Sequence, residues 1–216
     1  MSRRARYCVL ALLLAGCAGR PTQPPAASGA SIEQLAAAVA DDAARSERET
    51  DARVREQIAD DALSNADACI AKEPQAAACL YERAVALGLQ ARAHPARALD
   101  LLKSMLELLS RADTADADYD QAGASRVRAL VLLRAPGWPL GPGDVDAGLE
   151  AARRAISLKP QYVPNVLALA EAQGKSGDVT GARDSYARAR ALAQALPPGQ
   201  DREDWLRRAD QGLQRK

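Results

Sequence analysis

The segment GDVDAG at residues 143–148 returns as GDVTGA at residues 177–182, 34 residues further along the chain. With the same offset, RAISL at 154–158 aligns with RARAL at 188–192, so the register is kept through a whole helix. Thirty-four residues is the period of the tetratricopeptide repeat, a pair of antiparallel helices that stacks on its neighbours. The repeat therefore predicts an all-α fold, an antiparallel array of helix hairpins built from degenerate tetratricopeptide-like repeats.

The pattern upstream of this repeat is also helical. From Ser31 onward apolar residues recur at spacings of three and four, and no alternating β-branched stretch is long enough for a strand. Ser31 and Gln34 form a capping box at the start of the first helix, and the segment from Asp201 predicts a C-terminal cap helix. The remaining pattern predicts helices over 31–46, 49–72, 75–90, 96–111 and 122–135, with a turn-like acidic segment at 112–120.

Two of these helices carry a prediction about packing. In the 49–72 helix, the apolar side is marked by Val54, Ile58, Ala62 and Ala66. The 96–111 helix is apolar on most sides, which is typical of a helix surrounded by others.

The composition of the chain agrees with close helix packing. Among its 216 residues are 49 alanines and no phenylalanine, and aromatic residues make up 3%. Alanine is the best helix former and is depleted in strands. The formal net charge of +1 supplies no field to steer the protein onto nucleic acid, so we expect no nucleic-acid partner.

The first residues predict a signal peptide that is removed from the mature protein. Residues 1–16 combine a basic start with an apolar run, as in a signal peptide, and the segment LAGC at 14–17 resembles the bacterial lipobox. The lipobox implies that Cys17 is lipidated and becomes the first mature residue, whereas an ordinary cleavable signal is the alternative. Ala18 implies export to the outer membrane, on its periplasmic face. Residues 17–30 then form a flexible tether, and 31–216 form the folded domain.

Two cysteines lie inside the predicted helical domain. Cys69 and Cys79 are each five residues from Pro74, so a helix hairpin that turns at Pro74 places them level with each other. A disulfide is one interpretation, and two buried thiols in small-residue positions are the other.

No catalytic arrangement is recognisable. The chain contains one histidine, His94, and lacks the ligand spacings of metal sites, a nucleophile elbow and a phosphate loop. Its carboxylate pairs are typical of solvated helix faces. We therefore expect a protein that is not an enzyme, with no cofactor and no metal.

A second pattern extends from Asp118 to Glu171. It combines an Asp-Tyr pair, a glycine, an arginine, a Pro-Gly-x-Pro loop and a Gly-Asp helix start, followed by proline, tyrosine, asparagine and a Leu-Ala-Glu triplet. The matching residues are Asp118, Tyr119, Gly123, Arg126, Pro136, Gly137, Trp138, Pro139, Gly143, Asp144, Pro160, Tyr162, Asn165, Leu169, Ala170 and Glu171. Ala122 stands in place of one glycine of a pair.

Together with the lipobox, this pattern resembles the T component of tripartite ATP-independent periplasmic (TRAP) transporters, the TatT family of repeat-containing lipoproteins. The resemblance implies a lipid-anchored periplasmic scaffold that docks a solute-binding protein and offers an apolar groove to a ligand. The candidate residues for binding a ligand or partner are Arg126, Trp138, Pro139, Tyr162, Asn165 and Glu171.

Several alternatives stay open at this point. Arg126 either extends to solvent or pairs with Asp118 or Asp120, and Trp138 either lines a groove or anchors its loop to the core. The alternative function is a repeat lipoprotein that supports envelope or pilus assembly without any small ligand. Its partner would then be another envelope protein, and a homo-oligomer is open in both cases.

Overall fold

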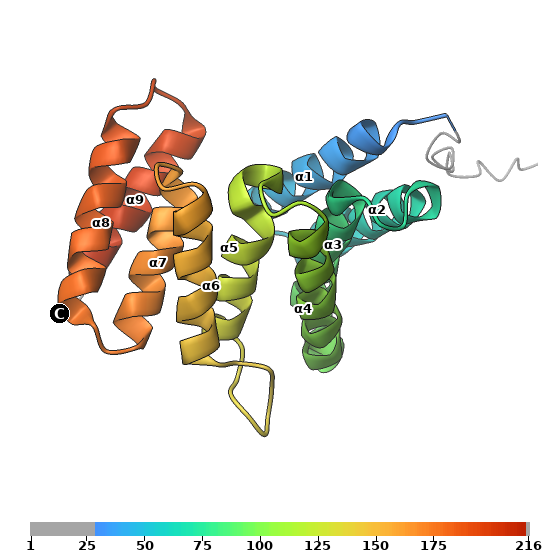
Figure 1. Ribbon diagram of the computed structural model, residues 1–216. Helices are drawn as coiled ribbons and strands as arrows, with labels where there is room; N and C mark the ends of the chain where they lie inside the picture. The colour runs from blue at the N-terminus through green and yellow to red at the C-terminus, as the bar shows by residue number, and fades with distance from the viewer. Residues whose placement is uncertain (1–28, 215–216) are drawn as a thin grey trace, which may run out of the picture.

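The computed structural model describes residues 29–214, which form an all-α array of packed helices (Figure 1). The predicted signal peptide, Cys17 and nearly all of the predicted tether lie outside the described residues. Across residues 29–214 we find no helix whose length and hydropathy would let it span a bilayer.

The described helices follow the chain in hairpins. Their bounds are α1 (Ile32–Arg48), α2 (Ala52–Lys72), α3 (Ala77–Ala93), α4 (Ala98–Ala115), α5 (Tyr119–Arg134), α6 (Val145–Leu158), α7 (Val163–Lys175), α8 (Val179–Gln194) and α9 (Gln200–Gln214), with a short 3-10 turn, η1 (Pro95–Arg97), before α4.

The helices form two layers. The odd-numbered helices α1, α3, α5, α7 and α9 each contact the next odd-numbered helix and make a continuous inner row. The even-numbered helices α2, α4, α6 and α8 contact only their neighbours in the chain and cover the outside. This is the arrangement of a helix-hairpin array, and it confirms the predicted all-α fold.

The 34-residue repeat has a direct structural counterpart. Asp144 and Asp178 are the N-caps of α6 and α8, and each accepts a hydrogen bond from a backbone N–H three residues later, at 3.0 Å and 2.9 Å. A side-chain acceptor at this position satisfies an otherwise unpaired helix donor. The capping box of Ser31 and Gln34 is also present at the start of α1.

Alanines fill the contacts between helices, as the composition predicts. Small side chains let helix axes approach closely, so little volume is needed between them. The alanines that are fully buried are Ala59, Ala62, Ala66, Ala84, Ala86, Ala122, Ala129, Ala152, Ala155, Ala168, Ala170, Ala172, Ala189, Ala193 and Ala209.

The apolar side of α2 is buried at Ile58, Ala62 and Ala66 but not at its first residue. Val54 is 43% exposed, because in the α2–α3 hairpin it lies level with His94, where α3 has already ended. The acidic segment 112–120 is not a single turn, since α4 continues to Ala115 before the chain reverses.

The α2–α3 hairpin holds the two cysteines level with each other. Cys69 and Cys79 are buried and joined by a disulfide, with their Cα atoms 5.2 Å apart. Leu35 of α1 packs against them.

We expect the double substitution Cys69→Ala and Cys79→Ala to lower the free energy of unfolding by about 2–3 kcal/mol, because the cross-link restricts the unfolded chain. Urea unfolding of the oxidised protein measures this loss. Dithiothreitol should destabilise the natural protein and leave the variant unchanged. Equal sensitivity of both proteins to the reductant would contradict the prediction.

Candidate functional site

An apolar groove opens on the inner row of helices. Its volume is about 790 Å³, and it lies between α3 and α5, with α1 on one side. Most of its lining residues are apolar. The lining residues are Ala43, Ala44, Glu47, Tyr81, Val85, Gly88, Leu89, Arg92, Leu102, Met105, Arg126, Val127, Leu130, Val131, Arg134, Ala135, Pro136 and Tyr162.

The groove exists because the inner row is loosely packed at one place. Of the successive odd-numbered helices, α3 and α5 contact each other least. Leu102 and Met105 of α4 therefore reach the groove from the outer layer. Gly88 makes room for this approach, since a Cβ atom there would lie 3.2 Å from the Met105 methyl group. The prediction that the apolar α4 is surrounded by other helices is thus wrong, because part of its apolar surface lines the groove.

A buried arginine closes one end of the groove. Arg126 of α5 is 8% exposed, and its Nη2 donates to Asp120 Oδ2 at 2.6 Å. Tyr81 of α3 donates its hydroxyl to the same carboxylate oxygen at 2.7 Å, and its ring lines the groove. Asp120 is therefore the partner of Arg126, while Asp118 pairs with Lys159 at 3.2 Å.

The backbone around Asp120 is strained. Asp120, Gln121 and Ala122 have φ values of 47°, 55° and 63°, so three successive residues adopt the left-handed conformation. This conformation is unfavourable for residues other than glycine, because their Cβ atom crowds the backbone. Arg126 compensates by donating to the carbonyls of Asp120 and Gln121 at 3.0 Å and 3.3 Å. Strained segments of this kind are concentrated at functional sites.

Asn165 ties this turn to the next hairpin. It is fully buried at the start of α7, accepts from Arg126 Nη1 at 3.2 Å, and donates to the Gln121 carbonyl at 3.0 Å. Its amide also donates to the carbonyls of Ala155 and Lys159, which end α6. The single side chain thus links α5, α6 and α7.

Tyr162 completes the polar end of the groove. The Arg126 guanidinium carbon lies 5.2 Å from the centre of the Tyr162 ring, which is within the range of cation–π attraction. Trp205 of α9 meets the same ring edge-on at 6.0 Å. Three predicted residues, Arg126, Tyr162 and Asn165, are therefore brought together.

A second carboxyl group is buried behind this end. Glu82 is 4% exposed and accepts a hydrogen bond from the Tyr119 hydroxyl at 3.4 Å. Burial, aided by the nearby charge of Asp120, raises the pKa of Glu82 to about 8.

Glu171 lies apart from this cluster. It accepts two hydrogen bonds from Arg134, at 2.8 Å from Nε and 2.7 Å from Nη2, and so bridges α7 to α5. Partial burial works to raise the pKa of its carboxyl, but the bonds from Arg134 outweigh this effect and hold that pKa below the usual range. Arg134 lines the groove, whereas Glu171 lines two neighbouring hollows.

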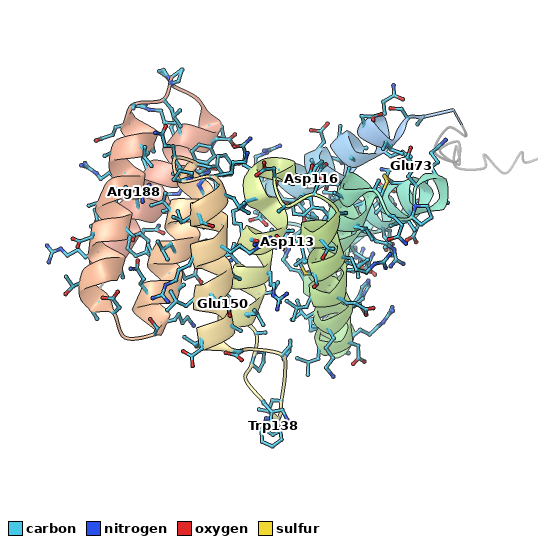
Figure 2. The ribbon with its side chains drawn as sticks, viewed as in Figure 1. Glu73, Asp113, Asp116, Trp138, Glu150 and Arg188 are labelled. Carbon is cyan, nitrogen blue, oxygen red and sulfur yellow. A yellow bond between two sulfur atoms is a disulfide. The ribbon has the colours of Figure 1, made fainter. Side chains whose placement is uncertain are left out.

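The loop at residues 136–143 does not meet either expectation for Trp138. The Trp138 side chain is 89% exposed at the tip of the loop, away from the helices (Figure 2), and Leu140 is 72% exposed. Both the groove-lining and the anchoring interpretation are therefore wrong. Pro139 shares this exposed tip, so it does not line the groove either.

The loop needs no anchor because its own backbone closes it. The N–H of Gly143 donates to the Pro136 carbonyl at 2.8 Å, and that of Gly141 donates to the Gly137 carbonyl at 3.1 Å. A Cβ atom on Gly143 would lie 2.2 Å from the Ala135 carbonyl oxygen, so glycine is required for this closure.

Sequence reasoning missed several residues of the groove. Tyr81 is 45 residues from Arg126, so no local pattern joins them. Helix periodicity could have identified Arg134, because it lies eight residues after Arg126 and therefore on a similar face of α5. Leu130, between them, lines the groove as well.

Comparisons with known proteins add no family: no family model matches the chain, and no curated protein matches it significantly. Among the described residues no group of three or more histidine, cysteine, aspartate or glutamate side chains is placed to hold a metal ion.

Proposed function

We propose that this protein is a lipid-anchored scaffold of the bacterial envelope that binds an apolar molecule in the groove between α3 and α5. In this proposal it serves a TRAP-type uptake system and docks a solute-binding protein through the exposed loop at 136–143. The proposal includes no catalysis. The lipobox at Cys17 and the pattern from Asp118 to Glu171 support the envelope location and the transport role.

The groove is the observation that carries the proposal. Its volume of about 790 Å³ falls in the range of small-molecule sites, which are mostly apolar and have a few well-placed polar groups. Val85, Leu130 and Val131 supply apolar walls, while Tyr81 and Tyr162 supply hydroxyl groups at one end.

The loop supports the docking part of the proposal. Exposed tryptophan and leucine side chains on a closed loop are unusual on a free surface, and tryptophan is enriched at the energetic centres of protein interfaces. The loop begins at Pro136, which also lines the groove, so a partner bound there would lie beside the groove.

We expect the neutral fluorophore N-phenyl-1-naphthylamine to bind the protein saturably, and Ala44→Trp to weaken this binding at least tenfold. Ala44 is exposed on α1 and lines the groove, so a larger side chain there occupies the groove without disturbing the core. Fluorescence titration measures the affinity.

The matched control is Ala187→Trp. Ala187 is exposed on the outer helix α8 and lines none of the hollows described above. This variant should bind the fluorophore as the natural protein does. Unchanged binding by Ala44→Trp, or an absence of saturable binding to the natural protein, would show that the groove is not a binding site for apolar molecules.

We expect Trp138→Ala to leave the free energy of unfolding within about 0.5 kcal/mol of the natural value, because the side chain is exposed. Affinity for a solute-binding protein encoded beside this gene should fall by about tenfold or more. Calorimetric titration and circular dichroism test the two parts. A lower melting temperature with unchanged affinity for the solute-binding protein would show instead that Trp138 stabilises the fold and does not bind the partner.

The second candidate is a scaffold for envelope or pilus assembly that uses the same loop and has no small ligand. The exposure of Trp138 and Leu140 favours it as much as it favours the first. A membrane pull-down on the natural protein and on Trp138→Ala separates them. Loss of only assembly proteins in the variant would favour the second candidate.

A further inference from the structure

The loop between α5 and α6 is the centre of an exposed apolar patch. Trp138 and Leu140 at its tip are 89% and 72% exposed, and the tip projects away from the helices (Figure 2). Leu99 of α4 lies against the loop, because a Cβ atom on Gly141 would be 3.2 Å from its Cδ2 atom. Val145 begins α6 directly after the loop. In the described part of the chain, four of the seven exposed large apolar side chains therefore gather here.

The loop is suited to surroundings that hold little water. Residues 135–143 carry no charged side chain, and three of them are prolines, which have no backbone N–H. The N–H groups of Leu140, Gly141 and Gly143 donate to carbonyls within the loop itself. Few backbone donors would therefore lose a water partner if the tip entered an apolar medium, so the cost of moving it there is low.

The shape and chemistry of the tip favour a bilayer over a second copy of the chain. A stable dimer buries about 800 Å² on each subunit over a broad face, whereas this tip is narrow and projecting. A bilayer accepts such a tip at any point of its surface. Tryptophan is enriched where membrane and water meet, because its ring is apolar and its N–H is polar. Trp138 therefore has the side chain that this position in a bilayer prefers.

The predicted lipid anchor can bring the bilayer to the loop. Helix α1 begins beside Cys69, at the end of the α2–α3 hairpin that lies away from Leu99. Helix α3, with 17 residues, separates these two ends by about 26 Å. The chain from Cys17 to Gly29 can span at most about 40 Å. A lipid on Cys17 therefore does not hold the loop away from the membrane.

We propose that the loop inserts Trp138 and Leu140 into the interfacial layer of the bilayer that carries the lipid anchor, whenever no partner protein covers them. This inference rests on the lipid anchor of the proposed function and adds a resting place for the docking loop. A solute-binding protein must then withdraw the loop from the bilayer in order to dock, so the membrane and the partner compete for the same two side chains.

The fluorescence of Trp138 tests this proposal. The chain has two tryptophans, and Trp205→Phe leaves Trp138 as the single reporter while keeping a ring against Tyr162. The full-length lipidated protein is reconstituted into phosphatidylcholine vesicles, and flotation on a density gradient shows that it is anchored. Bromine on the acyl chains quenches tryptophan only on close approach. We expect brominated lipid to lower the Trp138 emission about twofold, with bromine nearer the head groups quenching most.

Leu140→Asp in the same background should remove at least half of this quenching, because it takes away an apolar side chain and adds a charge that is costly to dehydrate. Leu140 is exposed, so the fold does not depend on it. The control is Leu196→Asp, which makes the same change at an exposed leucine just after α8, at the opposite end of the array (Figure 1), and should leave the quenching unchanged.

The outcomes separate this inference from the proposed function. If the protein does not float with the vesicles, the lipid anchor is absent and both fail. If it floats but bromine leaves the Trp138 emission unchanged, or if Leu140→Asp is quenched as strongly as the parent, only the insertion of the loop is overturned. Docking of a solute-binding protein, which is measured by titration, would then stand.

Discussion

Arg126→Met is expected to lower the free energy of unfolding by about 2–3 kcal/mol, because it removes at once the partner of the buried Asn165 side chain and the donor to the left-handed turn. Asp120 loses its cation, and Asn165 loses the donor to its carbonyl oxygen. The carbonyls of Asp120 and Gln121 lose the bonds that hold the left-handed turn. Methionine has a similar length, so little volume is lost.

Urea unfolding followed by circular dichroism measures this effect. Arg128→Met is the control, because Arg128 is exposed on the same helix, and we expect it to change stability by less than about 0.5 kcal/mol. Arg126→Lys should restore only part of the loss, since an ammonium group cannot reproduce the two-sided contacts of a guanidinium. Equal stabilities of Arg126→Met and Arg128→Met would show that the contacts of Arg126 contribute little to the free energy of unfolding.

Glu82→Gln is expected to change how stability depends on pH. The pKa of Glu82 is about 8 in the folded protein and near 4.5 when unfolded, so between these values the folded state holds a proton that the unfolded state releases. The natural protein therefore loses stability as pH rises from about 4.5 to 8. A shift of this size corresponds to a loss on the order of 4–5 kcal/mol, and glutamine, which does not ionise, avoids it.

The difference between the two proteins isolates Glu82 from all other titrating groups. Denaturant unfolding at pH 5, 6.5 and 8 should show the variant gaining stability relative to the natural protein at each step. Glu150→Gln, at an exposed position on α6, should show no such trend. A constant difference across this range would mean that Glu82 ionises normally in the folded protein.

The fold could be predicted because its signals are local. The spacing of the two GDV segments specifies a repeat, and the aspartates in them act as caps within three residues. The symmetry of Cys69 and Cys79 about Pro74 likewise follows from a single hairpin turn. The length of α4 was less predictable, since an acidic segment is compatible with both a helix end and a turn.

The candidate site was only partly predictable. Arg126 and Asn165 were identifiable as polar residues on apolar helices, and both are buried in one cluster. Trp138 was placed wrongly because scarce aromatic residues are usually buried, and the loop's own hydrogen bonds are not visible in composition.

The weak contact between α3 and α5 is bridged by α4. Helix α4 packs against both of them, and its Asp113 accepts hydrogen bonds from Ser125 of α5 and Arg154 of α6. The cluster of Tyr81, Asp120 and Arg126 adds a direct link between α3 and α5. Ala122, which takes a left-handed conformation where the resembled pattern has glycine, lies in the same turn as Asp120, so the chain keeps a costly backbone where its two halves meet.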